Sequence, residues 1–199
     1  GGTDLKSFYK DEQGIVLSST INKYIYVVAK RQIGIVEYKY RINWSQVELK
    51  NKIEDIKHPI VRKCLEYMKI DFPIEITTFA DIPASTGLGS SSAFAVGLMH
   101  ALFALKGQLA TKYTLAKNAA LIEVQMLGRI MGKQDHFASS YGDLNVIKFN
   151  ANESVEVEPV FYKNSTKSKL EKNLLLFYTS VKRDSSKVLE SQNNSSSTS

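Results

Sequence analysis

A run of glycines and hydroxyl side chains lies between an expected strand at residues 74–79 and an apolar segment at residues 93–105. Glycine lets backbone N–H groups approach an anion closely, and a helix start adds unpaired N–H donors and a favourable dipole. This chemistry suits a phosphate group. The alternative interpretation is a plain serine-capped helix after a flexible turn. The candidate residues of the loop are Pro83, Gly87, Leu88, Gly89, Ser90, Ser91 and Ser92.

The loop differs from two common nucleotide-binding motifs. No lysine follows Gly89, which excludes a Walker loop, and Ser92 stands where the dinucleotide fingerprint has its third glycine. Three consecutive serines supply oxygen ligands instead. A hydroxyl beside phosphate oxygens can bind Mg²⁺, because this ion takes few protein ligands and completes its shell with phosphate and water.

A metal ion at this loop also calls for a carboxylate, and Glu123 is the candidate. It lies in the otherwise uncharged segment 119–128, beside Ile122 and Val124. Burying a carboxylate there without a partner would be costly. We therefore interpret Glu123 as a buried, paired group, with a simply exposed glutamate as the alternative.

Asp135 follows Gly132 at the expected start of a helix. Two interpretations are open. The carboxylate caps the helix, or it acts as a base or orienting acceptor for a hydroxyl that attacks phosphorus. The histidines, His58, His100 and His136, lack metal-ligand spacing and are expected to be structural, although His136 adjoins Asp135.

Hydrophobic periodicity predicts the elements that position these residues. Strands are expected at residues 14–18, 24–28, 74–79, 144–149 and 155–160, and helices at residues 59–68, 93–105, 114–127 and 134–142. The first two strands are expected to lie in one antiparallel sheet. Apolar and polar residues alternate less cleanly over residues 33–40. Thr114 is the expected N-cap of the helix at residues 114–127. The predicted fold class is α+β.

The C-terminal part changes in composition. Residues 163–172 are polar and rich in lysine, as in a linker, whereas residues 174–178 are apolar and predict a strand that opens a second domain. We expect one domain over residues 1–165, the start of another over residues 170–192, and a disordered tail over residues 193–199.

Composition narrows the class of protein. The chain has 199 residues, 43% of them hydrophobic, which is enough for a sizeable core. Its net charge is +6, but the lysines are scattered among acids, so we expect no nucleic-acid partner. The single cysteine, Cys64, excludes an internal disulfide and favours a reducing, cytoplasmic setting. No apolar stretch is long enough for a membrane span, and the oligomeric state stays open.

The motifs resemble those of the GHMP kinase superfamily, which comprises galactose, homoserine, mevalonate and phosphomevalonate kinases. The serine loop is similar to its phosphate loop, and residues 1–5 resemble the second half of its first glycine-rich motif. Glu123 with residues 127–129 resembles the helix that faces the loop. Residues 132–137, with Tyr141, Gly142 and Asn145, are similar to the sugar-1-kinase branch, within which the D-glycero-D-manno-heptose 7-phosphate kinases are the most similar group.

This resemblance implies a role for each candidate residue. Asp135 would be the catalytic aspartate, Ser91 and Glu123 would bind Mg²⁺, and the loop would hold the phosphates of ATP. The substrate side would comprise Gly2, Thr3, Asp4, Lys133 and Asp135.

The implied fold is a GHMP kinase N-terminal domain, a mixed or antiparallel sheet with packed helices, whose first strand would precede Gly1, followed by the start of a second α+β domain. If the chain is complete, it should be catalytically impaired.

The implied reaction is ATP-dependent phosphorylation of the anomeric hydroxyl of D-glycero-D-manno-heptose 7-phosphate, giving the 1,7-bisphosphate used for surface polysaccharide precursors. A neutral-sugar 1-kinase and a non-catalytic nucleotide- or sugar-binding relative are the alternatives. A sugar phosphate also calls for cations at its far end. The candidates are Lys6, Lys10, Lys133, Arg183 and Lys187, each of which is otherwise a solvated surface charge.

Overall fold

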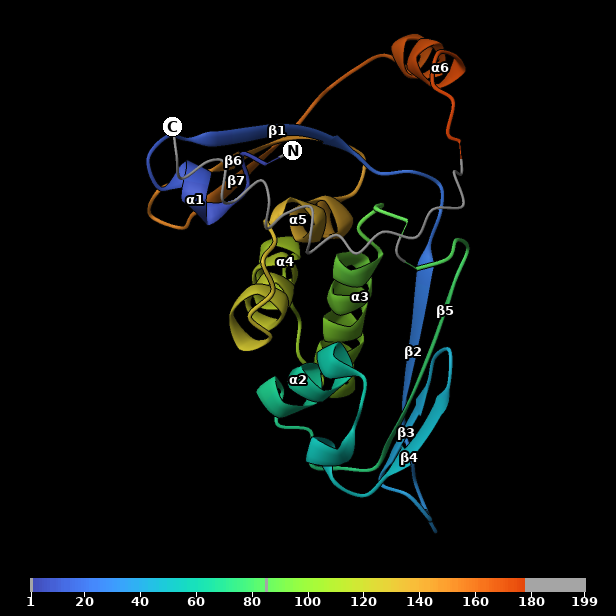
Figure 1. Ribbon diagram of the computed structural model, residues 1–199. Coiled ribbons are helices and arrows are strands. Elements are labelled where there is room, and N and C mark those ends of the chain that lie inside the picture. The colour runs from blue at the N-terminus through green and yellow to red at the C-terminus, as the bar shows by residue number, and fades with distance from the viewer. Residues whose placement is uncertain (1, 85, 178–199) are drawn as a thin grey trace.

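Two β-sheets flank the helices of the chain in a computed structural model that describes residues 2–84 and 86–177 (Figure 1). The first sheet is antiparallel, in the order β1-β6-β7. The second has the order β2-β5-β3-β4, in which β3 and β5 are parallel and the other pairs antiparallel. The strands are β1 (Gly14–Ser19), β2 (Ile25–Arg31), β3 (Tyr40–Asn43), β4 (Val47–Lys50), β5 (Ile74–Ala80), β6 (Leu144–Phe149) and β7 (Val155–Pro159). The α+β prediction is confirmed.

The pairing of the first two strands differs from the prediction. They lie in different sheets, because β1 pairs with β6 and β2 pairs with β5. Ile33 and Ile35 are exposed, and the next strand begins only at Tyr40. Strand β4 was not predicted. Side-chain alternation specifies which face of a strand is buried, but it does not specify the partner strand.

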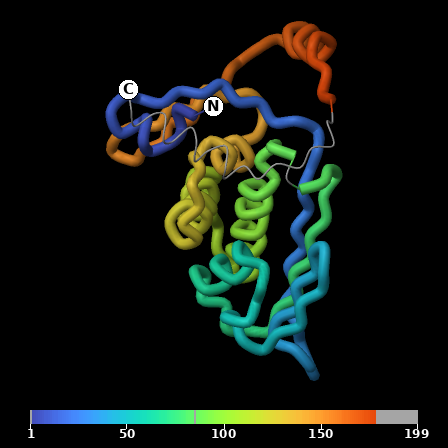
Figure 2. The backbone as a smooth tube through the Cα atoms, in the orientation of Figure 1, coloured from blue at the N-terminus to red at the C-terminus, as the bar shows by residue number. Residues whose placement is uncertain are grey.

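Helix α3 is the centre of the larger core. It lies along β2 and also packs against α2, α4 and α5 (Figures 1 and 2). Leu98, Met99 and Leu102 of α3 are fully buried in the same cluster as Ile74 and Ile76 of β5. The helices are α1 (Lys6–Tyr9), α2 (Pro59–Tyr67), α3 (Ser90–Leu105), α4 (Lys112–Ala120), α5 (Gln134–Tyr141) and α6 (Asn164–Lys172), with a short 3₁₀ turn η1 (Ile53–Asp55).

The helix expected at residues 114–127 is capped and shaped differently. Thr111 rather than Thr114 is the N-cap, and its Oγ1 accepts a hydrogen bond from the Thr114 N–H at 3.1 Å. The helix α4 then widens into a π-helical segment, η2 (Leu121–Met126). Such wide turns are uncommon and occur often at functional sites. Glu123 lies within this segment.

The C-terminal described residues differ from the predicted linker and strand. Residues 163–172 contain α6, which has no buried residue and lies apart from the other helices in Figure 1. Residues 174–177 are exposed and form no strand. A strand needs a neighbouring strand for its backbone hydrogen bonds, and composition alone does not supply one. The rest of the expected second domain and tail lies outside the described residues, so this domain stays a prediction.

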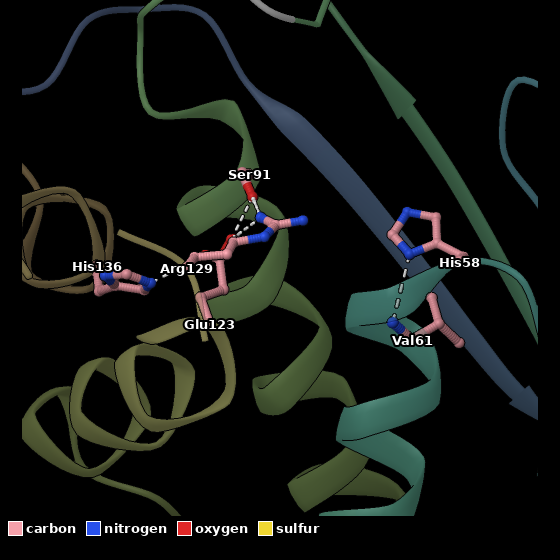
Figure 3. Close-up of polar contacts among 6 residues, drawn as sticks. All are labelled: His58, Val61, Ser91, Glu123, Arg129 and His136. Atoms are coloured by element: carbon pink, nitrogen blue, oxygen red, sulfur yellow. Dashed lines mark hydrogen bonds and ion pairs between the residues drawn. The ribbon is translucent and has the colours of Figure 1, made fainter. Parts of the chain in front are cut away.

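His58 has the structural role that was expected. Its Nδ1 accepts a hydrogen bond from the Val61 N–H at 3.3 Å at the start of α2 (Figure 3). Its ring packs between Trp44 and Phe94, with centroid distances of 4.8 and 5.0 Å. Burial lowers the pKa of His58 below its ordinary value, because the charged imidazolium is desolvated there.

We predict that His58 makes the free energy of unfolding pH-dependent. Because its folded-state pKa is lowered, its stabilisation is present above the unfolded pKa of about 6.5 and is lost as the pH falls through the folded pKa. Between pH 7.5 and pH 5.5, the free energy of unfolding measured with denaturant should decrease less for His58→Asn than for the wild type. Asparagine keeps a capping group at this position. The control His100→Asn, at an exposed position, should behave as the wild type, and an equal decrease in His58→Asn would refute this role.

Candidate active site

Glu123 is fully buried and has three polar partners. One oxygen, Oε1, accepts from the Ser91 hydroxyl and the Arg129 guanidinium, and the other, Oε2, lies 2.9 Å from His136 Nε2 (Figure 3). The partners come from the start of α3, from the loop after η2 and from the first turn of α5. The exposed-glutamate alternative is therefore wrong, and this carboxylate joins three segments.

The partners of Glu123 keep it ionised. Burial alone would raise the pKa of this carboxyl, but the hydrogen bond and charge of His136, the Ser91 hydroxyl and the Arg129 charge outweigh burial and lower it. A carboxylate that stays charged at neutral pH in the interior suits the binding of a cation.

Arg129 occupies the position that a metal ion was expected to take. Its Nη1 donates to Ser91 Oγ at 2.6 Å and also to Glu123. Ser91 and Glu123 thus already present converging oxygens to a positive charge. One hydroxyl and one carboxylate form a donor set that suits Mg²⁺, provided that phosphate oxygens and water complete the shell. Nothing in the spacing of the sequence pointed to this role of Arg129.

The serine loop leaves its backbone donors available. Gly89 is the N-cap of α3, with φ 68°, and no side chain caps this helix. Gly87 also has a positive φ of 77°, a conformation that glycine adopts without strain. The hydroxyls of Thr86 and Ser92 are buried without a hydrogen-bond partner among the described residues. The plain serine-capped alternative is thus wrong, whereas open N–H groups and unpaired hydroxyls fit a phosphate.

Asp135 lies beside this loop. A Cβ atom at Gly89 would be 3.1 Å from the Asp135 Cγ. The N-cap residue of α5 is Lys133, and no side chain forms a capping hydrogen bond there, so Asp135 does not act as the helix cap. Burial raises the pKa of the Asp135 carboxyl, and the charge of Asp4 raises it further.

Asp4 holds the start of α5 from the other end of the chain. Its Oδ2 accepts from the Gln134 N–H at 3.0 Å, its Oδ1 accepts from the Gly2 N–H at 3.3 Å, and it is 5% exposed. A Cβ atom at Gly132 would lie 1.7 Å from Asp4 Oδ2, so this close approach requires glycine there. Asp4 and Asp135, which come from distant parts of the sequence, are therefore close enough for the charge of Asp4 to raise the pKa of Asp135.

The remaining candidates lie around this pair. The Thr3 hydroxyl donates to the Ile15 carbonyl at 3.0 Å and joins the first motif to β1. Lys133 forms an ion pair with Glu153, a residue that the sequence did not single out because it lies in a turn with no recognisable motif. Pro83 and Leu88 are exposed at the edge of the loop.

Within the described residues, no helix is long and apolar enough to cross a membrane.

The fold and these motifs correspond to a known family. Residues 57–143 match the family described as "GHMP kinases N terminal domain". The chain therefore contains a GHMP kinase N-terminal domain, as its motifs predicted.

Particular relatives are sugar kinases. The chain is 30% identical, over 96% of its length, to a D-glycero-alpha-D-manno-heptose 7-phosphate kinase of Campylobacter jejuni. It is 24% identical, over 65% of its length, to a galactokinase of Thermotoga petrophila, of which it covers 38%. Among solved structures, a D-glycero-D-manno-heptose 1-phosphate kinase from Bacteroides thetaiotaomicron matches 86% of the chain with a TM-score of 0.78 and 25% identity. The chain spans 59% of the length of both heptose kinases.

We predict that Asp135→Asn stabilises the domain. Because the pKa of Asp135 is raised in the folded state, its ionised form opposes folding. Its contribution to the free energy of unfolding is fully present below the unfolded pKa of about 3.9 and is lost as the pH rises through the folded pKa. At pH 7 the variant should therefore have a higher midpoint of urea unfolding than the wild type, and the difference should vanish near pH 3.5. The exposed Asp11→Asn is the control, and an unchanged or lower midpoint in Asp135→Asn at pH 7 would contradict the prediction.

Proposed function

We propose that the protein is a sugar 1-kinase that transfers the terminal phosphoryl group of ATP to the anomeric hydroxyl of D-glycero-D-manno-heptose 7-phosphate. The observation that carries this proposal is that the serine loop, the paired Glu123 and Asp135, which does not cap its helix, come together near the starts of α3 and α5. Similarity to heptose kinases along nearly the whole chain supports the substrate class. Because ATP is a cytoplasmic substrate, we propose that the protein acts there.

The phosphates of ATP would lie on the loop that precedes α3. The open N–H groups of the first turn and the unpaired Ser92 hydroxyl would donate to their oxygens. Ser91 and Glu123 would hold Mg²⁺, which supplies charge neutralisation on the phosphates. Arg129 would leave these oxygens, and its 37% exposed side chain has a path toward solvent.

Asp135 would act on the attacking hydroxyl. An anomeric hydroxyl is more acidic than an ordinary alcohol, so one carboxylate suffices to accept or orient its proton. The raised pKa of Asp135 makes the ionised form a stronger base than an exposed aspartate. Asp4 already accepts two backbone N–H groups, and its remaining lone pairs can accept from sugar hydroxyls.

A neutral-sugar 1-kinase is the second candidate, favoured by the similarity to galactokinases. A purely binding role is disfavoured, because a binding protein needs neither the proposed metal ligands Ser91 and Glu123 nor a carboxylate, Asp135, beside the attacking hydroxyl. The test is steady-state kinetics of the full-length gene product with Mg·ATP on heptose 7-phosphate, the unphosphorylated heptose and galactose. We expect the highest kcat/KM for heptose 7-phosphate; absence of turnover on every sugar would refute a kinase.

We predict that the metal site depends on Ser91 and Glu123. Ser91→Ala and Glu123→Gln should each raise the Mg²⁺ concentration for half-maximal rate by about tenfold or more, because the first removes the hydroxyl ligand and the second removes the negative charge of the carboxylate. Mn²⁺ titration of the ADP complex by electron paramagnetic resonance gives the same comparison without turnover.

Ser19→Ala, at an exposed position in β1, is the matched control and should behave as the wild type. Circular dichroism verifies that Glu123→Gln remains folded. Wild-type affinity for Mn²⁺ in both site variants would mean that phosphates and water hold the ion alone.

A further inference from the structure

A small cavity opens beside Asp4. Its volume is about 100 Å³, enough for a phosphate group. Its lining includes Asp4, Lys6, Tyr9, Lys133 and Glu153. The wall therefore combines two lysines and a tyrosine hydroxyl with one exposed and one buried carboxylate.

Three donors converge on the carboxylate of Glu153. Lys6 Nζ lies 2.8 Å from Oε1, the Tyr9 hydroxyl donates to Oε2 at 2.9 Å, and Lys133 Nζ also pairs with Oε2. The side chain of Lys133 is 15% exposed, and its ammonium lies 5.1 Å from the centroid of the Tyr9 ring. This is the donor set of an anion site, filled by a carboxylate of the chain itself.

The electrostatics describe the same site. Burial would raise the pKa of the Glu153 carboxyl, but the hydrogen bonds from Lys133, Lys6 and Tyr9 lower it to about 2. Desolvation and Glu153 raise the pKa of Tyr9, so this hydroxyl remains a donor. The carboxylate is thus fully ionised at neutral pH, and the cluster favours an anion over a neutral group.

Glu153 can be displaced from this position. It lies in the turn between β6 and β7, at φ 68°, and its side chain is 39% exposed. A phosphate offers more acceptor oxygens and more negative charge than a carboxylate, so it can satisfy all three donors after Glu153 turns toward solvent.

Asp135 and Asp4 connect the serine loop to this cavity. The serine loop contacts Asp135, the charge of Asp4 acts on Asp135, and Asp4 also lines the cavity. A sugar whose hydroxyls bind Asp4 and whose anomeric end meets Asp135 would extend its opposite end toward Lys133. Lys10 pairs with Asp11 and does not line the cavity, while Arg183 and Lys187 lie outside the described residues.

We propose that Lys6, Tyr9 and Lys133 bind the phosphate that the sugar substrate already carries, and that Glu153 occupies this site when substrate is absent. The inference rests on the proposed function and identifies the residues that select a phosphorylated sugar. A sugar without the phosphate forms none of these charge-assisted hydrogen bonds, so the site favours a sugar that carries this group.

Lys133→Met, Lys6→Met and the matched control Lys10→Met test the site in the full-length gene product. For Lys133→Met we expect kcat/KM on heptose 7-phosphate to fall by about tenfold or more, mainly through KM, because a charge-assisted hydrogen bond is lost. The kcat/KM on unphosphorylated heptose should fall much less than that on heptose 7-phosphate, a split that a general folding defect would not produce. Lys6→Met should show a smaller loss, since this lysine is more exposed, and Lys10→Met none.

Glu153→Gln provides a test in the opposite direction. The variant removes the competing charge, so inorganic phosphate should inhibit it at a severalfold lower concentration than the wild type. Improved binding of an anion cannot result from misfolding. Unchanged or weaker inhibition would overturn the placeholder role of Glu153.

Kinetics of the wild type distinguish the phosphate site from the kinase activity. Equal kcat/KM of the wild type on both heptoses would overturn the phosphate site and leave the kinase intact. If no sugar is phosphorylated, the proposed function fails, and calorimetric binding of heptose 7-phosphate to the wild type and Lys133→Met still decides the site. Loss of binding in the variant supports it, and equal binding overturns it.

Discussion

Burial of the Glu123 carboxylate is the constraint on which the site depends. A charge without access to water must have partners, and this one takes them from three separate segments: Ser91 at the start of α3, Arg129 after η2 and His136 in α5. Each partner fixes a functional element. Ser91 belongs to the serine loop, and His136 adjoins Asp135, so pairing Glu123 also orients the loop toward the aspartate. The π-helical turn of η2 brings the carboxylate to this junction.

A second long-range contact completes the arrangement. Asp4 holds the first turn of α5 and lies against Gly132, where a side chain would collide with it. The same carboxylate lines the cavity with Lys6 and Lys133. The proposed acceptor half of the site therefore depends on the packing of the N-terminal motif against α5, while the proposed phosphate half depends on α3. Two acidic residues, Asp4 and Asp135, connect these halves.

Local patterns predicted most elements but not their partners. The apolar segment of α3, the glycine after it and the periodicity of α2 and α5 are signals carried within a few residues, and these helices were predicted close to their bounds. The expectation that Glu123 is buried and paired was also correct, since an isolated charge in an apolar segment is itself a signal. The separation of β1 and β2 into two sheets, the contact of Arg129 with Ser91 and the convergence on Glu153 are long-range contacts. No local pattern encodes them.

The proposed orientation of the sugar, with its anomeric end at Asp135 and its phosphate at Lys133, determines which hydroxyl is phosphorylated. The most direct measurement is phosphorus NMR of the product formed by the full-length gene product from Mg·ATP and heptose 7-phosphate. We expect one new phosphate signal coupled to a single anomeric proton, while the original signal keeps its coupling to two methylene protons. A new phosphate coupled to any other proton of the sugar, or coupled to the original phosphorus as a diphosphate, would contradict it.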